Sequence, residues 1–414
     1  MITITCADCG ATQAIPDLPP GGTAECHRCD RLLARRSHGG TGVALACAIA
    51  IVILLPPAVF LPLMDSTIKN IVFGQSRLVT SVPVIYSEVW FPFAFGFFFF
   101  ALLFPWLRAI LQVIVLTLKR VWQRGRLFRW TEELRMWSMT DVVVIAGLIA
   151  YFRASISASV GLQSGALCYL AVAIFAWIGD HALDRREVWN SILPDTQEYP
   201  RRHYASCDSC ELAAAGRRPG DPCPRCGSRL DRPIAPRFIL ASAAVAAALP
   251  LCVPAFSAAI LVNDSITGVL ENTILGTVQY LADRGYWEYG VVVLIAGVVI
   301  PVVELLGLIW LLARVRIPTT RGLVRRTRVY RVLYRLVRWP MIIPFIAAIA
   351  APIVKFPGID DIVAGPGATP LFAIIALLML AVRFYEPKLM WRAAGVDESG
   401  WQPGAPLAQP ASVA

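Results

Sequence analysis

The chain has 414 residues, of which 57% are hydrophobic and only 16% are charged, and its mean hydropathy is +0.61. This composition excludes an ordinary soluble globular protein. The net charge is +10, and there are only four histidines. With so few histidines, and no Ser-His-Asp or His-Glu-x-x-His pattern to supply a base or nucleophile, we expect that the protein is not an enzyme.

The chain begins with a compact cysteine module. It contains two Cys-x-x-Cys pairs, Cys6 with Cys9 and Cys26 with Cys29. Two such pairs, separated by a short hairpin, suit one tetrahedral ion with four thiolate ligands. We predict a structural zinc ion that staples a module too small to build its own core. Iron remains possible because rubredoxin-like sites use similar spacing, and we expect His27 to be a bystander.

Four apolar stretches follow the first module, at about 43–64, 90–118, 140–158 and 162–180. A membrane-spanning helix needs about 20 mostly apolar residues, so each is a candidate span. The first contains the adjacent prolines Pro56 and Pro57, which remove backbone donors and can bend or break the helix. Such a break would indicate a cavity or a moving element, and a simple packing kink is an equal alternative.

The second half of the chain repeats this plan. A second module carries Cys207, Cys210, Cys223 and Cys226, and again four apolar stretches follow, at about 237–261, 289–313, 339–355 and 368–385. Prolines Pro250 and Pro254 match the proline pair of the first half. We therefore predict an all-α polytopic membrane protein made of two tandem parallel repeats of four transmembrane helices, each preceded by a small four-cysteine zinc-ribbon (rubredoxin-like) module.

These observations predict the domain organisation. The first module occupies residues 1–38 and the second module 199–234. The first half, with four spans, is 39–198, and the second half, also with four spans, is 235–394. Residues 395–414, rich in Pro and Ala, are expected to form a disordered cytoplasmic tail.

Arginines predict the orientation. Basic loops separate the second and third spans of each half, at 119–135 and 314–338, whereas the loops on the other side are neutral or acidic. The positive-inside rule then places both termini and both modules in the cytoplasm. Because no nucleic-acid reader motif accompanies these basic stretches, we expect contact with the membrane and no binding of nucleic acid.

Further positions correspond between the halves. Pro105 and Arg108 in the second span match Pro301 and Glu304 in the sixth, Trp137-Ser-Met139 matches Trp339-Pro-Met341, and Trp189 matches Trp391. Together with the segments Gly276–Tyr289, Met136–Val142 and Pro357–Trp391, these features resemble the paraquat-inducible protein A family, which includes the lipophilic-envelope-spanning transport proteins. The resemblance covers nearly the whole chain.

The resemblance implies a function. Members of that family are bacterial inner-membrane proteins that work with mammalian-cell-entry (MCE) domain proteins, which bridge the periplasm. It therefore implies an inner-membrane subunit of an intermembrane phospholipid transport system. The sequence contains no Gly-x-x-x-x-Gly-Lys-Ser/Thr phosphate loop, so uphill transport would need an ion gradient or a partner. The alternative is a metal- or redox-sensing membrane regulator that uses the four-cysteine sites.

Three ionisable residues lie within or at the ends of predicted spans, namely Arg108, Asp141 and Glu304. A charge inside a span costs about 2.5–3.5 kcal/mol, so each needs a partner or water. Family members tend to have a basic residue at both the Arg108 and Glu304 positions, so a proton relay built on those groups would have to use different residues in this chain. We predict that the three line a transport path and hypothesise that Arg108 pairs with Glu304. The alternatives are snorkelling towards an interface and, for Asp141, favourable placement at a helix N-terminus.

Overall fold

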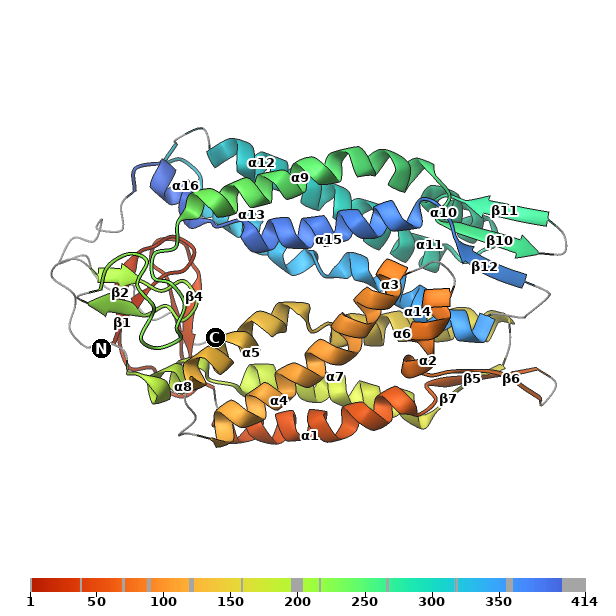
Figure 1. The fold of residues 1–414 in the computed structure, drawn as a ribbon, viewed down its shortest axis with the longest axis horizontal. Helices are drawn as coiled ribbons and strands as arrows, with labels where there is room; N and C mark the ends of the chain where they lie inside the picture. The colour runs from red at the N-terminus through yellow and green to blue at the C-terminus, as the bar shows by residue number, and fades with distance from the viewer. Residues whose placement is uncertain are drawn as a thin grey trace.

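The computed structural model describes residues 2–37, 39–68, 71–87, 91–118, 123–157, 159–194, 204–215, 217–265, 268–315, 317, 319–354 and 360–396. Residues 397–414 of the predicted tail lie outside this part, as do Lys119 and Arg120 of the first predicted basic loop. The helices run roughly side by side along one direction (Figure 1). The two cysteine modules lie together at one end of the helices, and small β-sheets lie at the other.

The first half is built around four long helical segments. In chain order its elements are α1 (Gly40–Phe60), β5 (Met64–Ile68), β6 (Ile71–Ser76), α2 (Leu78–Ser87), α3 (Phe91–Phe97), the π-helix η1 (Phe98–Leu103), α4 (Phe104–Thr117), α5 (Arg124–Trp137), α6 (Thr140–Ser157), β7 (Ser159–Leu162), α7 (Ser164–Ala182) and α8 (Arg185–Ile192).

The second half has the same order of elements, with one additional 3-10 helix before its third span. They are α9 (Ile234–Ser257), β10 (Leu261–Ser265), β11 (Gly268–Asn272), α10 (Ile274–Asp283), α11 (Trp287–Leu294), the π-helix η2 (Ile295–Val299), α12 (Ile300–Val315), α13 (Leu323–Leu336), the 3-10 helix η3 (Trp339–Met341), α14 (Ile342–Val354), β12 (Asp360–Ala364), α15 (Ala368–Phe384) and α16 (Lys388–Ala393). The predicted duplication and mostly helical class are thereby confirmed.

Within the described residues, seven helical segments are long and apolar enough to cross a membrane. They are Gly40–Phe60, Phe93–Thr117, Arg124–Phe152, Ser164–Ala182, Ala235–Ser257, Trp287–Val315 and Leu323–Ile349. The eighth predicted span is the shorter apolar helix Ala368–Phe384. The predicted basic loops differ from the structure, because α5 and α13 occupy most of them as helices that lead into the third span of each half.

Two small β-sheets were not predicted from the sequence. In each half, the hairpin after the first span pairs with the strand between the third and fourth spans, which gives the antiparallel orders β6-β5-β7 and β11-β10-β12. These strands are short and lie beside long apolar segments, so the alternation of apolar and polar residues that indicates a strand is not visible in the sequence. The sheets tie together the ends of three spans in each half.

The prolines of the first and fifth spans affect the helix differently from those of the second and sixth spans. Helices α1 and α9 continue through Pro56, Pro57, Pro250 and Pro254, so the break considered for these spans is not formed. In the second and sixth spans, a π-helix directly precedes the segment that contains Pro105 or Pro301. Changes of hydrogen-bond register of this kind accommodate local strain and occur frequently at functional sites.

Backbone groups around the first π-helix are satisfied by neighbouring helices. Pro105 has no N–H to offer the carbonyl of Ala101, four residues earlier, and the Tyr169 hydroxyl donates to that carbonyl at 2.9 Å. The carbonyl of Phe100 accepts the N–H of Met139 at 3.2 Å, just before α6 begins. The π-helix therefore helps to fix the positions of α6 and α7.

The two halves meet through their third spans. Helices α6 and α14 lie between the helices of the first half and those of the second (Figure 1). The contacts include the Phe97 and Phe345 rings, whose centroids are 5.5 Å apart, and a hydrogen bond of 2.9 Å from the Ser76 hydroxyl to the Ile349 carbonyl. One apolar cluster extends across both halves.

Candidate metal centres and polar groups of the membrane helices

All four Cys-x-x-Cys turns share one backbone geometry. The residue after the second cysteine has a positive φ in each, at Gly10 (76°), Asp30 (56°), Glu211 (58°) and Gly227 (68°). Its N–H donates to the carbonyl of the first cysteine at 2.8–2.9 Å in every turn. The sequence predicted this conformation at the two glycines only, because a positive φ is much less common for residues other than glycine.

The elements beside these turns are short hairpins. In the first module, β1 (Ile2–Thr5) pairs with β2 (Thr12–Ile15), and β3 (Thr23–Glu25) pairs with β4 (Leu32–Arg35). In the second module, β8 (Tyr204–Ser206) pairs with β9 (Ala213–Ala215). Hairpins of this length have little core of their own, so the cysteine cluster supplies the centre of each module.

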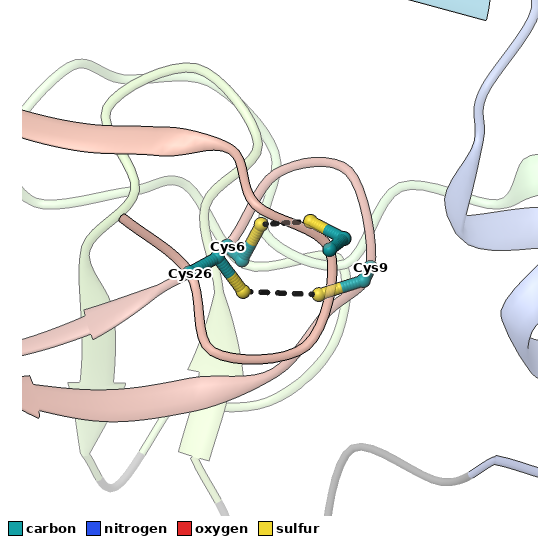
Figure 2. Close-up of side chains that lie close together, drawn as sticks. Cys6, Cys9 and Cys26 are labelled. Carbon is teal, nitrogen blue, oxygen red and sulfur yellow. Dashed lines mark hydrogen bonds between the residues drawn. The ribbon is translucent and has the colours of Figure 1, made fainter. Parts of the chain in front are cut away.

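The sulfur atoms of each module form a compact group. In the first module, the Sγ atoms of Cys6 and Cys29 are 3.6 Å apart, as are those of Cys9 and Cys26 (Figure 2). The corresponding pairs in the second module are 3.5 and 3.6 Å apart, and in each set all four ligand atoms lie within 4.8 Å of one another. Zn–S bonds of about 2.3 Å in a tetrahedron place sulfurs about 3.8 Å apart, so both sets fit a metal ion.

In each module the hydrogen bonds among the four thiols lower the pKa of two cysteines and raise the pKa of the other two. Hydrogen bonds from the Cys210 and Cys223 thiols lower the pKa of Cys207 to about 6, and those from Cys207 and Cys210 lower the pKa of Cys226 as well. The Ser228 hydroxyl lies 3.1 Å from the sulfurs of both Cys207 and Cys226. A metal ion binds the deprotonated form, and the close grouping of the four sulfurs in each set is what allows the site to hold one. His27 bonds instead to Gln13 and is not among the four ligand atoms.

The first module docks on α13, a helix of the second half. Arg331 donates to the Cys29 carbonyl at 2.8 Å, to the Cys29 sulfur at 3.2 Å and to the Asp8 carboxylate at 2.8 Å. Arg328 donates to Asp30 at 2.7 Å. The module therefore contacts the half that follows the other module in the sequence.

The second module docks on α5, a helix of the first half. Arg129 donates to the Cys226 carbonyl at 3.2 Å. A Cβ at Gly125 would overlap the carbonyl oxygen of Arg225, so this close approach requires a glycine. Asp208 of the same module also pairs with Lys388 of the second half.

The two modules bind each other. Arg31 of the first module forms ion pairs with Asp8 of its own turn and, at 3.0 Å, with Glu211 of the second module. The Thr5 N–H donates to the Glu211 carbonyl at 3.3 Å, and Ile4 bridges to Leu212. Burial raises the pKa of the Glu211 carboxyl, although Arg31 and Arg186 oppose this shift. Together the modules form one unit.

The predicted pair between Arg108 and Glu304 is not formed. Arg108 instead forms an ion pair with Asp180 of α7, and the Arg135 Nε atom lies 3.2 Å from the other Asp180 oxygen. Within the described residues, both Glu304 carboxylate oxygens lack a hydrogen-bond partner, although the residue is only 1% exposed. The prediction failed because matching sequence positions need not face one another across a pseudo-two-fold axis.

The third predicted residue, Asp141, lies in the first turn of α6 and accepts a hydrogen bond of 2.7 Å from Arg338 of the second half. The three predicted transport residues are therefore not brought together. A small cavity beside Arg108 is lined by polar and apolar groups, including Gln112, Ser138 and Thr140. Sequence reasoning missed Asp180, although an acid at the end of an apolar span was a signal that a cation lies nearby.

These features define a polytopic membrane protein made of two similar halves with two buried four-cysteine sites. The chain belongs to the paraquat-inducible protein A family, whose model matches residues 43–192 and 240–395. The two matched regions correspond to the two helical halves, which confirms the resemblance noted from the sequence.

Curated relatives match along nearly the whole chain. The intermembrane transport protein PqiA of Escherichia coli (strain K12) is 24% identical, covering 94% of this chain and 95% of the relative. A probable intermembrane transport protein of Haemophilus influenzae is 23% identical with the same coverage. The lipophilic envelope-spanning tunnel protein A of Escherichia coli (strain K12) is 22% identical, covering 95% of this chain and 92% of the relative. No solved structure gives a significant match.

Proposed function

We propose that the chain is the inner-membrane subunit of an intermembrane phospholipid transport system, working with a periplasm-spanning MCE-domain protein. The observation that carries this proposal is end-to-end similarity to relatives named for intermembrane transport. The two sets of apolar helices are consistent with it, because they give a multi-pass protein in contact with lipid. We infer transport and not catalysis as its role.

The proposed orientation places both modules and both termini in the cytoplasm. Basic helices α5 and α13 lie against the modules, so positive charge is concentrated at this end of the molecule. The positive-inside rule assigns such an end to the cytoplasm. The two three-stranded sheets would then lie on the periplasmic side, where an MCE-domain partner would be met.

We assign one structural zinc ion to each module, held by Cys6, Cys9, Cys26 and Cys29 or by Cys207, Cys210, Cys223 and Cys226. Sites with four cysteine ligands and no open position are typical of structural zinc. Iron is the second candidate, since thiolate sites of this geometry also hold it. Iron or reversibly oxidised thiols would favour the alternative function, a metal- or redox-sensing membrane regulator.

The transport path is proposed to pass polar groups of the membrane helices. Arg108, which is paired with Asp180, lines the small cavity of the first half, and Glu304 is a buried acid of the second. Buried ionisable groups in spans are costly and so commonly mark ion or substrate pathways. Asp141 is assigned to the entry of this path, next to Arg338.

Native mass spectrometry of the protein, extracted in mild detergent together with its neighbours, tests this function. Two zinc ions, bound phospholipid and a co-purifying MCE-domain protein are the expected result. An unrelated multi-pass protein from the same membrane, extracted identically, controls for adventitious lipid. Iron or sub-stoichiometric metal, with no more lipid than the control and no such partner, would instead support the sensor.

A further inference from the structure

The two module contacts are equivalent and crossed. The pairs Trp137/Trp339 and Trp189/Trp391 set a common register for the halves, and in that register Arg129 matches Arg331. Each of these arginines donates to the carbonyl of the last cysteine of a module, Cys226 and Cys29 respectively. In both cases the arginine belongs to the half that follows the other module.

Apolar packing supports the same crossing. A separate cluster of buried residues joins the second module to the first half only. From the first half it contains Ala44, Val115, Phe128, Ala182, Leu183, Val188 and Trp189, and from the second module Ala205, Leu212, Ala214, Leu230 and the four cysteines. The Arg28 side chain of the first module lies over the Trp391 ring of the second half, 5.9 Å from its centroid.

We propose that the two modules form a metal-dependent crossed clamp, in which each metal ion holds its module against the basic helix of the opposite half and so fixes the two halves at this end. The physical basis is the small size of the modules. Their hairpins and turns depend on the metal for folding. Only a folded turn presents the cysteine carbonyl, and in the first module Asp8 and Asp30, in positions that the arginines can reach.

The clamp is closed by the bonds between the modules. Arg31 joins the first module to Glu211 of the second, and Asp208 of the second pairs with Lys388. A chain of contacts therefore runs from α5 through both modules to α13. Metal binding by the first module and docking of this module on α13 are thermodynamically linked. If metal loss weakens docking by a given factor, then separating α13 from the module weakens metal binding by the same factor.

The two sites are not coupled equally to the helices. Arg331 donates directly to the Cys29 sulfur, at 3.2 Å, and so contacts a metal ligand atom. In the second module, the hydroxyl of Ser228, within the module itself, lies beside the ligand sulfurs. The metal of the first module is therefore the one whose retention depends more on the position of the opposite half.

Hydrogen exchange of the full-length protein, read by mass spectrometry, tests the clamp. The variant Cys6→Ser/Cys9→Ser is expected to accelerate exchange in α13 (residues 323–336) about tenfold, the effect of losing a charge-assisted hydrogen bond, and to affect α5 less. The variant Cys223→Ser/Cys226→Ser is expected to affect α5 (residues 124–137) more than α13. The opposite pattern, or no acceleration in either helix, would overturn the proposal.

Two further measurements do not depend on the folding of cysteine variants. Chelator added to the zinc-loaded wild type should accelerate exchange in both helices, and added Zn²⁺ should reverse this; unchanged exchange would overturn the clamp.

The variant Gly125→Ala should retain two metal ions yet accelerate exchange in residues 223–229. Gly42→Ala is the matched control, because a Cβ at Gly42 meets nothing within 4 Å. Identical exchange in the two glycine variants would also overturn the proposal.

Discussion

The two halves share the same arrangement of helices and strands, but the charged side chains of their membrane helices differ. In the first half, Asp180 holds both Arg108 and Arg135. In the tryptophan register, Asp180 and Arg135 match Val382 and Val337. When the halves are aligned on Pro105 and Pro301, Arg108 matches Glu304, whose oxygens lack partners among the described residues. Duplication has therefore preserved the architecture while the polar groups have diverged. The charged groups of one half cannot be inferred from those of the other.

The largest effect is expected from Asp180→Asn. This change removes the carboxylate that pairs with both Arg108 and Arg135 and leaves Glu132 as the acid beside the two arginines. Breaking a buried ion pair costs about 3–5 kcal/mol. Thermal unfolding in detergent should show a large fall in stability. Asp17→Asn, at an exposed position, is the control. A fall no greater than that of the control would show that the first half does not depend on its ion-paired group.

The next effect concerns the rate of metal release from each module. It compares the contact that Arg331 makes with the first module and the contact that Arg129 makes with the second. Arg331→Ala should accelerate metal release from the first module by about 10–100-fold, the usual range for residues that bond to metal ligands. Arg129→Ala should accelerate release from the second module less, because Arg129 bonds to a carbonyl and not to a sulfur. Release is followed with a colorimetric chelator. Equal acceleration would contradict the asymmetry between the modules.

The shared backbone plan is tested by a matched pair of glycines. Gly165 and Gly367 begin the fourth span of each half and bond to the carbonyls of Pro62 and Ala259 at 2.9 and 2.8 Å. A Cβ at either would come within 2.7 Å of a backbone oxygen. Gly165→Ala and Gly367→Ala should therefore lower the free energy of unfolding by similar amounts, about 1–3 kcal/mol.

Gly42→Ala serves as the control for both glycine variants, since its Cβ would point into open space. The measurement is the unfolding midpoint in detergent. If only one of Gly165→Ala and Gly367→Ala lowers the midpoint, the two halves do not share the close packing of the fourth span against the end of the first.

The smallest effect is expected from Glu304→Gln. The carboxylate makes no hydrogen bond with the described residues, so its replacement removes no such interaction, and the stability change should be below about 1 kcal/mol. The comparison with Asp180→Asn uses the same unfolding assay. A loss as large as that for Asp180→Asn would mean that Glu304 has a partner that stabilises the fold.

Features encoded by local spacing were predictable from the sequence. The cysteine ligand sets follow from paired Cys-x-x-Cys turns, and the spans follow from apolar length, because both depend on neighbours in the chain. The Arg108–Asp180 pair was missed because it depends on how α4 and α7 rotate against each other. Sequence alone offers only the requirement that a buried charge has a partner, without naming it.

The crossing of the modules was also missed, although two signals were present. Arg129 and Arg331 occupy matching positions before the third spans, and Gly125 interrupts a helix that otherwise favours larger residues. Neither signal indicates which module the helix contacts. The three-stranded sheets were missed for a similar reason, since β5 pairs with a strand almost a hundred residues later in the chain.

The crossed arrangement also imposes an order on biosynthesis. Arg331 follows Cys29 by 302 positions, so the helix that receives the first module is translated long after the module itself. At about 5–20 residues per second, the wait is roughly 15–60 s. During this interval the newly synthesised module cannot dock on α13, and its cysteines are exposed to the oxidants and other metals of the cell. Under the proposed metal assignment, early capture of a metal ion would protect these cysteines until α13 has been made.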